Sequence, residues 1–274
     1  MEKCGVLAGK GVLPLEVAKG INLSGLEPVI IGLQEEVDPY LEEAGFFVTK
    51  VNLGELGKIL NHLQNAGVKR LVMVGRVGKG ALFSNLKIDE EFQKILALLT
   101  IKNTDAILLA IVNYFEEHGI KVENQTEFVD HLVPKEGLLT GDPLSSREKQ
   151  DVKYGFEIAR EIGRLDIGQS VIVKNGVVLA VESMEGTDRT IQRGGELGGG
   201  GTIVVKVAKP HQDLRFDVPV IGMDTLDALL RSKARVLAIE AEKTIILDRD
   251  ELLTKAAENG LSVVALVNAS SIDK

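Results

Sequence analysis

The sequence predicts an α/β protein of two domains: an N-terminal parallel-sheet, Rossmann-like domain and a C-terminal mixed α/β (α+β) domain. In residues 3–123, short continuous apolar runs alternate with amphipathic helical patterns, which is typical of a parallel sheet covered on both faces. Turn-forming residues gather between Gln125 and Ser146, and an Asn-Gly hairpin pattern follows them. We therefore expect domains at 1–130 and 146–274, joined by a linker at 131–145.

The composition is that of a globular protein and excludes several classes. The 274 residues include 32 Lys and Arg against 40 Asp and Glu, for a net charge of −8 without a basic tract, which argues against non-specific nucleic-acid binding. Cys4 is the single cysteine, so an intrachain disulfide and a cysteine-built zinc site are excluded. No apolar run approaches the roughly 20 residues of a transmembrane helix, and the N-terminus lacks a signal-peptide pattern. A cytoplasmic protein is expected.

The first half contains the elements of a parallel sheet in chain order. Leu56, Ile59, Leu60 and Leu63 recur at helical spacing, and Gly119 follows the last helix as a C-cap. The predicted strands are Cys4–Ala8, Pro28–Leu33, Arg70–Val74 and Ile120–Val122, and the predicted helices begin at Pro14, near Leu56 and near Thr104. Strand, helix and strand in succession indicate right-handed crossovers.

The second half mixes hairpin and helix signals. Ser145 or Ser146 is expected to cap a helix that runs to about Ile162, with Glu148 as the capping acid. Asn175-Gly176 then predicts a tight turn between two strands. The further predicted strands are 202–207, 218–221, 236–239, 244–247 and 261–267, and the further predicted helices are 224–230 and 250–258.

A glycine loop, Gly9–Pro14, follows the first predicted strand at the start of a helix. Free N–H groups and the helix dipole favour anions at such a place. The loop lacks the third glycine of a dinucleotide fingerprint and the ending of a Walker loop, and a glycine turn that only lets strand and helix pack is an equal alternative. Gly75-Arg76 follows the third predicted strand on the same edge, which favours a nucleotide or phosphate pocket.

Acidic residues concentrate in the second half. Glu182, Glu185, Thr187 and Asp188 fall within seven residues, and carboxylates at a strand end and the next turn can converge on Mg²⁺. A helix cap by Thr187 and Asp188 is the alternative reading of this cluster. Asp217 stands between Phe216 and Val218, where a carboxylate is costly to bury unless it binds a metal or hydrogen-bond donors.

Cations accompany these acids, and other catalytic patterns are missing. Lys206 and Lys209 follow a strand, and Arg164 and Gln169 flank the turn before the hairpin. The four histidines (His62, His118, His131 and His211) show no ligand spacing, and Ser145 and Ser146 lack the setting of a serine nucleophile. Acids that hold Mg²⁺ beside lysines suit phosphate-ester or pyrophosphate chemistry.

Five blocks, in order over nearly the whole chain, resemble the LpxI-type family of UDP-2,3-diacylglucosamine pyrophosphatases of lipid A synthesis. The blocks are Ala8–Pro14, Asp166–Gln169, Glu182–Asp188, Lys206–Pro210 and Asp217–Gly222. The resemblance implies a Mg²⁺-dependent hydrolase, with Mn²⁺ as a substitute, that cuts the pyrophosphate to UMP and 2,3-diacylglucosamine 1-phosphate (lipid X). It also implies water attack at the sugar-side phosphorus, an amphiphilic UDP-sugar lipid held between two domains, a homodimer, and transient contact with the inner membrane.

The resemblance also assigns site residues. It places the key catalytic aspartate on Asp217, with Asp188 and Glu182 as further catalytic groups and Asp217 and Asp188 as metal ligands. The residues expected to contact the substrate are Gly11, Gly75, Arg164, Gln169, Thr187, Lys206 and Lys209. Two other functions stay open: a dinucleotide-dependent oxidoreductase that uses the glycine loop, and a nucleotide-sugar binding protein without catalysis.

Overall fold

A computed structural model describes residues 1–34, 36–77, 88–100, 104–210 and 212–273. Two compact units make up the chain: Met1–Val129 with Leu214–Phe216, and Asp130–Asp213 with Asp217–Lys274. The predicted α/β class with two domains of different sheet type is confirmed. His211 lies outside the described residues.

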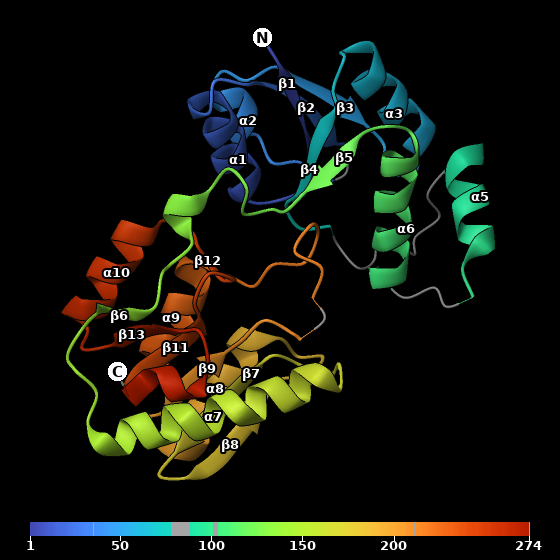
Figure 1. Ribbon diagram of the computed structural model, residues 1–274. Helices are drawn as coiled ribbons and strands as arrows, with labels where there is room; N and C mark the ends of the chain where they lie inside the picture. Colours follow the sequence, from blue (N-terminus) through green and yellow to red (C-terminus); the bar gives the residue numbers. More distant parts are fainter. Residues whose placement is uncertain (35, 78–87, 101–103, 211, 274) are drawn as a thin grey trace. The chain divides into compact units, whose positions relative to one another are not determined.

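The first unit is a doubly wound parallel sheet. Its described strands are β1 (Lys3–Ala8), β2 (Glu27–Leu33), β3 (Val48–Val51), β4 (Arg70–Val74) and β5 (Lys121–Glu123). Among the described residues they are ordered β3-β2-β1-β4-β5, and every pair is parallel (Figure 1). The order reverses direction between β1 and β4, so the loops that follow these two strands diverge there, at the point where such sheets bind ligands.

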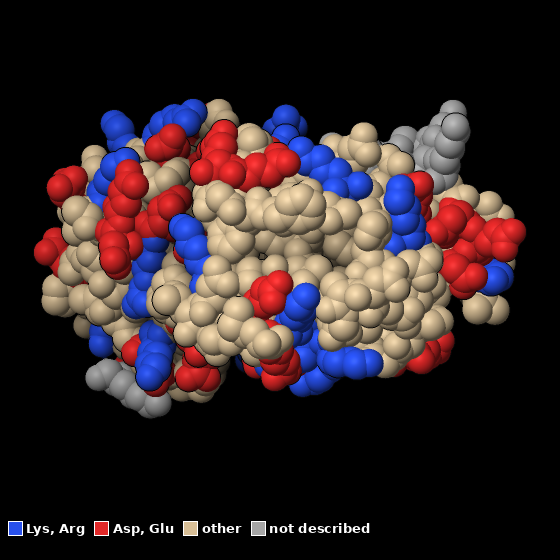
Figure 2. Space-filling view, turned by 90° about the horizontal axis from the view of Figure 1, so that it is seen from above, with Lys and Arg blue, Asp and Glu red and all other residues tan. Residues whose placement is uncertain are grey.

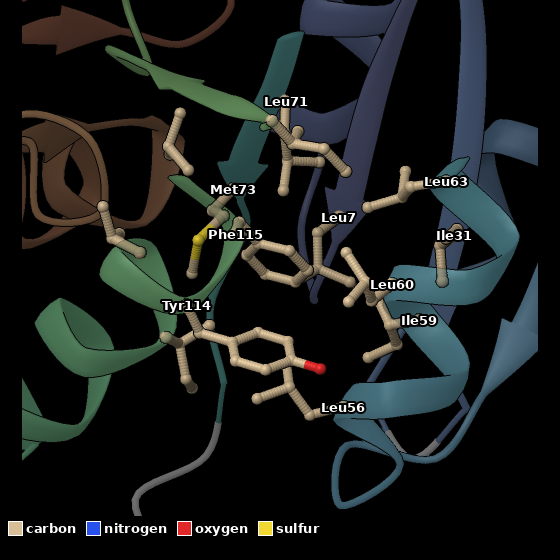
Figure 3. Close-up of a cluster of buried hydrophobic side chains, with 14 of the residues drawn as sticks. Leu7, Ile31, Leu56, Ile59, Leu60, Leu63, Leu71, Met73, Tyr114 and Phe115 are labelled. Atoms are coloured by element: carbon tan, nitrogen blue, oxygen red, sulfur yellow. The ribbon is translucent and has the colours of Figure 1, made fainter. Parts of the chain in front are cut away.

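Helices cover this sheet because their apolar faces match its buried strands. The described helices are α1 (Leu13–Leu23), α2 (Tyr40–Glu43), α3 (Leu56–Asn65), α5 (Glu90–Leu98) and α6 (Thr104–Glu117). The stripe predicted on α3 is buried, and Leu60 and Leu63 meet Phe115 of α6 and Leu7 of β1 in one cluster (Figure 3). Strand β3 and helix α5 were not predicted from the sequence. Strand β3 gives a weak signal because it is a short edge strand with only one fully buried residue.

The second unit is built on a mixed sheet. The described strands are β6 (Gly137–Thr140), β7 (Ser170–Lys174), β8 (Val177–Val181), β9 (Ile203–Lys206), β11 (Val236–Glu240) and β13 (Ser262–Leu266). They are ordered β6-β13-β11-β9-β7-β8 among the described residues, with β13, β11 and β9 parallel and the others antiparallel. Two short strands, β10 (Val220–Ile221) and β12 (Ile245–Ile246), pair separately.

Both faces of the six-stranded sheet are covered. The covering helices are α7 (Ser146–Arg164), α8 (Thr187–Gly198), α9 (Met223–Arg231) and α10 (Arg249–Glu258). Val171 and Val173 face a core with α7, whereas Ile172 between them faces the core with α8, α9 and α10. This alternation along β7 is the period-2 pattern of a strand buried on both sides. Strand β6 lies inside the segment that we expected to be a linker, because its backbone pairs with β13.

The surface charge is mixed. Acidic and basic side chains stand next to each other over much of the face drawn in Figure 2, in keeping with a chain that has no basic tract. No helix among the described residues combines the length and the hydropathy that crossing a bilayer requires. Cys4 is buried and free.

The start of α7 decides between the two serines considered as its cap. The hydroxyl of Ser145 accepts the N–H of Glu148 at 3.3 Å, and the Glu148 carboxylate accepts the N–H of Ser145 at 2.7 Å, which completes a capping box. Ser146 is the first residue of the helix.

Replacing Ser145 with alanine is expected to lower the free energy of unfolding by about 1 kcal/mol, because the Glu148 N–H loses its partner. Urea unfolding followed by circular dichroism measures the change. Ser146→Ala is the control and should shift the midpoint far less. Equal effects of the two substitutions would contradict the assignment of the cap.

Candidate active site

The ends of three neighbouring strands bring the predicted acids and lysines of the second unit together. Glu182 follows the last residue of β8, Ser170 begins β7, and Lys206 ends β9. In the antiparallel pair β7–β9, Ser170 lies directly opposite Lys206, and the N–H of Glu182 donates to the carbonyl of Ser170 at 2.9 Å. Strand register therefore places an acid and a base, 24 positions apart in the sequence, at one edge of the sheet.

Thr187 joins the two charged groups. The Lys206 ammonium donates to Thr187 Oγ1 at 2.7 Å, and the Thr187 hydroxyl donates to Glu182 Oε1 at 2.8 Å. The Ser170 hydroxyl lies 3.5 Å from the same Thr187 oxygen. Because the threonine hydroxyl both accepts and donates, it links the lysine to the glutamate in one chain of hydrogen bonds.

Lys206 is the electrostatic centre of this site. Its side chain is buried, and burial lowers its pKa because the ammonium has lost its water. The carboxylates of Glu182, Asp188 and Asp217 act in the opposite direction and favour the charged form. All three predicted catalytic acids thus influence the pKa of one buried ammonium.

Asp188 lies at the start of α8. Gly186, with φ of 83°, precedes the helix, and Asp188 lies in its first turn, where the helix dipole favours a carboxylate. Asp188 Oδ1 accepts the hydroxyl of Thr225 from α9 at 3.1 Å. Glu185 turns to Arg193 at 2.7 Å instead. The N-cap position of α8 is Gly186 and no side chain caps the helix there, so the capping alternative for Thr187 and Asp188 is not realised.

Gln169 reaches the site through a close approach of two backbones. A Cβ at Gly168 would lie 2.2 Å from the carbonyl oxygen of Glu182, so only glycine fits there. The next N–H, that of Gln169, donates to Glu182 Oε2 at 3.4 Å, and the Gln169 carbonyl accepts the N–H of Val207 at 3.0 Å. Gln169 Oε1 is buried without a partner, which suits a residue expected to contact a ligand.

Other predicted contact residues have different surroundings. Lys209 binds Asp166 at 2.6 Å, and Arg164 pairs with Glu161 at 3.0 Å on the exposed end of α7. None of the contacts described for Arg164 is with Glu182, Thr187 or Lys206. The Lys206 ammonium donates to Thr187 in the structure, and its contact with the substrate stays a prediction.

The glycines of the first unit form a separate feature. Gly9 and Gly75 pack backbone to backbone, since a Cβ on Gly75 would lie 2.7 Å from the carbonyl carbon of Gly9. Gly11 has a φ of 105° and open space around its Cα, but its N–H already donates to Asp38 Oδ2 at 2.7 Å. The packing role is therefore realised at Gly9 and Gly75, and an anion at Gly11 would have to displace Asp38.

The acids do not form a complete metal cage. Within the described residues, no three His, Cys, Asp or Glu side chains come together as a metal-binding group. Mg²⁺ is commonly held by one or two carboxylates together with water and substrate phosphate. The carboxylates of Asp188 and Asp217 are donors of the kind that Mg²⁺ prefers.

Ser170 and Thr225 were not predicted, because strand pairing and helix packing bring their hydroxyls to Thr187 and Asp188 from distant parts of the sequence. Sequence reasoning also missed Glu240, an acid at the end of the otherwise apolar β11. An acid that closes a buried strand is a signal of the same kind as Asp217 and was available in the sequence.

Comparison with known proteins agrees with these features. Residues 3–132 match the LpxI N-terminal domain and residues 135–264 match the LpxI C-terminal domain. The chain is 31% identical over 277 aligned positions to the UDP-2,3-diacylglucosamine pyrophosphatase LpxI of Caulobacter vibrioides, covering 97% of this chain and 98% of the relative. That relative is a hydrolase acting on a phosphoric anhydride. Both halves match in the order in which they occur here, and the chain therefore belongs to the LpxI family.

Proposed function

We propose that this protein hydrolyses the pyrophosphate of UDP-2,3-diacylglucosamine to UMP and 2,3-diacylglucosamine 1-phosphate, in lipid A synthesis. Membership of the LpxI family over both domains carries the proposal. The site of the second unit supports it, because the buried Lys206 ammonium is joined to the Glu182 carboxylate through Thr187 at one strand edge. A nucleotide-sugar binding protein without turnover would bind the same ligand, and release of UMP separates the two readings.

In the proposed reaction, a water oxygen attacks the sugar-side phosphorus and the bond from this phosphorus to the bridging oxygen breaks. The bridging oxygen leaves with UMP, and the attacking water gives up its proton. Asp217 is proposed to take this proton, since a carboxylate can act as a general base. Lys206, held by Thr187, keeps Glu182 and its neighbours in place without contacting the substrate.

Asp188 and Asp217 are the residues proposed to hold Mg²⁺, or Mn²⁺ in its place. A bound divalent ion polarises phosphoryl oxygens and lowers the pKa of coordinated water. The exposed position of Asp188 leaves it accessible to a phosphate, whereas Glu182 is enclosed by Thr187 and Gln169.

A cytoplasmic homodimer that touches the inner membrane while it binds its amphiphilic substrate is part of the proposal. Strand β8 supports the dimer, because it is outermost in its sheet and Val177–Val181 carries no charge that would block pairing with a second copy. Light scattering gives the mass, and co-sedimentation with vesicles containing the lipid substrate reports membrane contact. A monomer in every condition would exclude the dimer.

Asp217→Asn should reduce kcat by about 100-fold or more, because the amide cannot accept the proton of the attacking water. Release of UMP measures turnover, and circular dichroism measures folding, which should be unchanged. Asp227→Asn, on the exposed face of α9, is the matched control and should retain activity. Near-normal turnover of Asp217→Asn would refute the role of this residue.

Chelation of divalent ions with EDTA should abolish turnover, and added Mg²⁺ should restore it. Asp188→Asn should raise the Mg²⁺ concentration for half-maximal activity by about tenfold, because one carboxylate ligand is lost. The thermal midpoint measured with and without EDTA should stay the same, since the folded site is held by Lys206 and not by the ion. Full activity in EDTA would exclude the metal.

A further inference from the structure

Glu240 is a buried carboxylate that the reaction proposed above does not use. It ends β11, whose other residues are apolar, and its side chain is 1% exposed. Strand β11 runs parallel to β9 and pairs with it, so the ends of both strands lie at the same edge of the sheet. A carboxylate is costly to bury unless charges and hydrogen bonds compensate it.

The two oxygens of Glu240 have different partners. Oε1 accepts from Lys243 Nζ at 2.8 Å and from Arg160 Nη2 at 3.1 Å, two cations that are partly exposed. Oε2 accepts the backbone N–H of Ala208 at 3.0 Å. The two cations at Oε1 therefore compensate the charge of the carboxylate. Oε2 binds the main chain that follows β9.

We call this segment, Lys206–Lys209, the strap. It begins with Lys206 and ends with Lys209, the two lysines predicted for the candidate site. Its N–H groups are each bound by a different segment: Val207 by the carbonyl of Gln169, Ala208 by Glu240, and Lys209 by Gln212 Oε1 at 2.8 Å. Lys206 points inward to Thr187 at one end of the strap. The Ala208 bond ties the middle of the strap to the neighbouring parallel strand, beyond the strand pairing that ends at Lys206.

We propose that Glu240 is a positioning residue: its reach to the Ala208 N–H fixes the strap and so keeps the Lys206 ammonium on Thr187. The effect on turnover rests on the proposed pyrophosphatase function, whereas the effect on the strap does not. Glu240 itself contacts no group assigned to the substrate.

Two conservative substitutions of Glu240 separate the effect of its side-chain length from the effect of its charge. Glu240→Gln keeps the length of the side chain and an oxygen that accepts the Ala208 N–H, but loses the charge. Glu240→Asp keeps the charge near Arg160 and Lys243, but withdraws the carboxylate by one methylene from Ala208. A positioning role through the N–H requires the aspartate variant to be the more damaged one, and a role through the ion pairs requires the opposite.

The first measurement is steady-state release of UMP. We expect Glu240→Asp to lower kcat by about 10- to 100-fold with KM within about threefold of wild type, since Lys206 is proposed to hold the site in place without contacting the substrate. Glu240→Gln should stay within about threefold of wild type in both constants. Asp151→Ala is the matched control: Asp151 is also buried and accepts two backbone N–H groups, of Asn175 and Gly176, at the opposite end of β7. It should lower stability without changing kcat.

The second measurement needs no substrate. Acetylation of Lys206 by an amine-reactive ester is followed by mass spectrometry of its peptide, with the exposed Lys94 as internal standard. Lys206 should react at least tenfold faster in Glu240→Asp than in wild type, Glu240→Gln or Asp151→Ala, because the strap has been released.

Greater damage in Glu240→Gln than in Glu240→Asp, or equal labelling of Lys206 in all four proteins, would overturn the proposal. Release of the strap in Glu240→Asp with an unchanged kcat would overturn it as well. If the wild-type protein forms no UMP, the proposed function fails, and the labelling contrast alone then decides whether Glu240 holds the strap.

Discussion

The burial of one ammonium group is the constraint on which the candidate site depends. Lys206 ends a strand in the middle of the second sheet, where its side chain has no water to solvate it. A buried lysine is retained only where hydrogen bonds and opposite charges replace that water. Thr187 supplies the hydrogen bond, and Glu182, Asp188 and Asp217 supply the charge. The positions of Thr187 and Glu182 are therefore coupled to the lysine through hydrogen bonds.

This coupling gives the acids of the cluster different roles, although they stand close together in the sequence. Glu182 is enclosed and bonded to Thr187, so it belongs to the frame of the site. Asp188 is exposed at the start of α8 and is available to a ligand, while Glu185 is committed to Arg193. Exposure and hydrogen-bond partners, more than residue type, separate the carboxylates that a ligand can reach from the enclosed or paired ones.

The first unit illustrates how little a fold says about chemistry. Its strand order and glycine loop are those of nucleotide-binding sheets, yet Asp38 accepts the N–H of Gly11, and Gly9 and Gly75 serve the packing of two backbones. The same sheet serves many unrelated reactions. The match of both halves to LpxI is what favours a pyrophosphatase over an oxidoreductase for this chain.

The sequence by itself determined the α/β class, the start of α7, the Asn-Gly hairpin and the helical stripe of α3, because periodicity and turn chemistry are local properties of the chain. It also singled out Glu182, Thr187, Asp188, Lys206 and Asp217. Only the tertiary structure decided that Lys206 points inward, that Glu185 and Arg164 turn to other partners, and that Glu240 reaches Ala208. These outcomes depend on which strands pair and in which register, and pairing between distant segments leaves no periodic mark in the residues that it brings together.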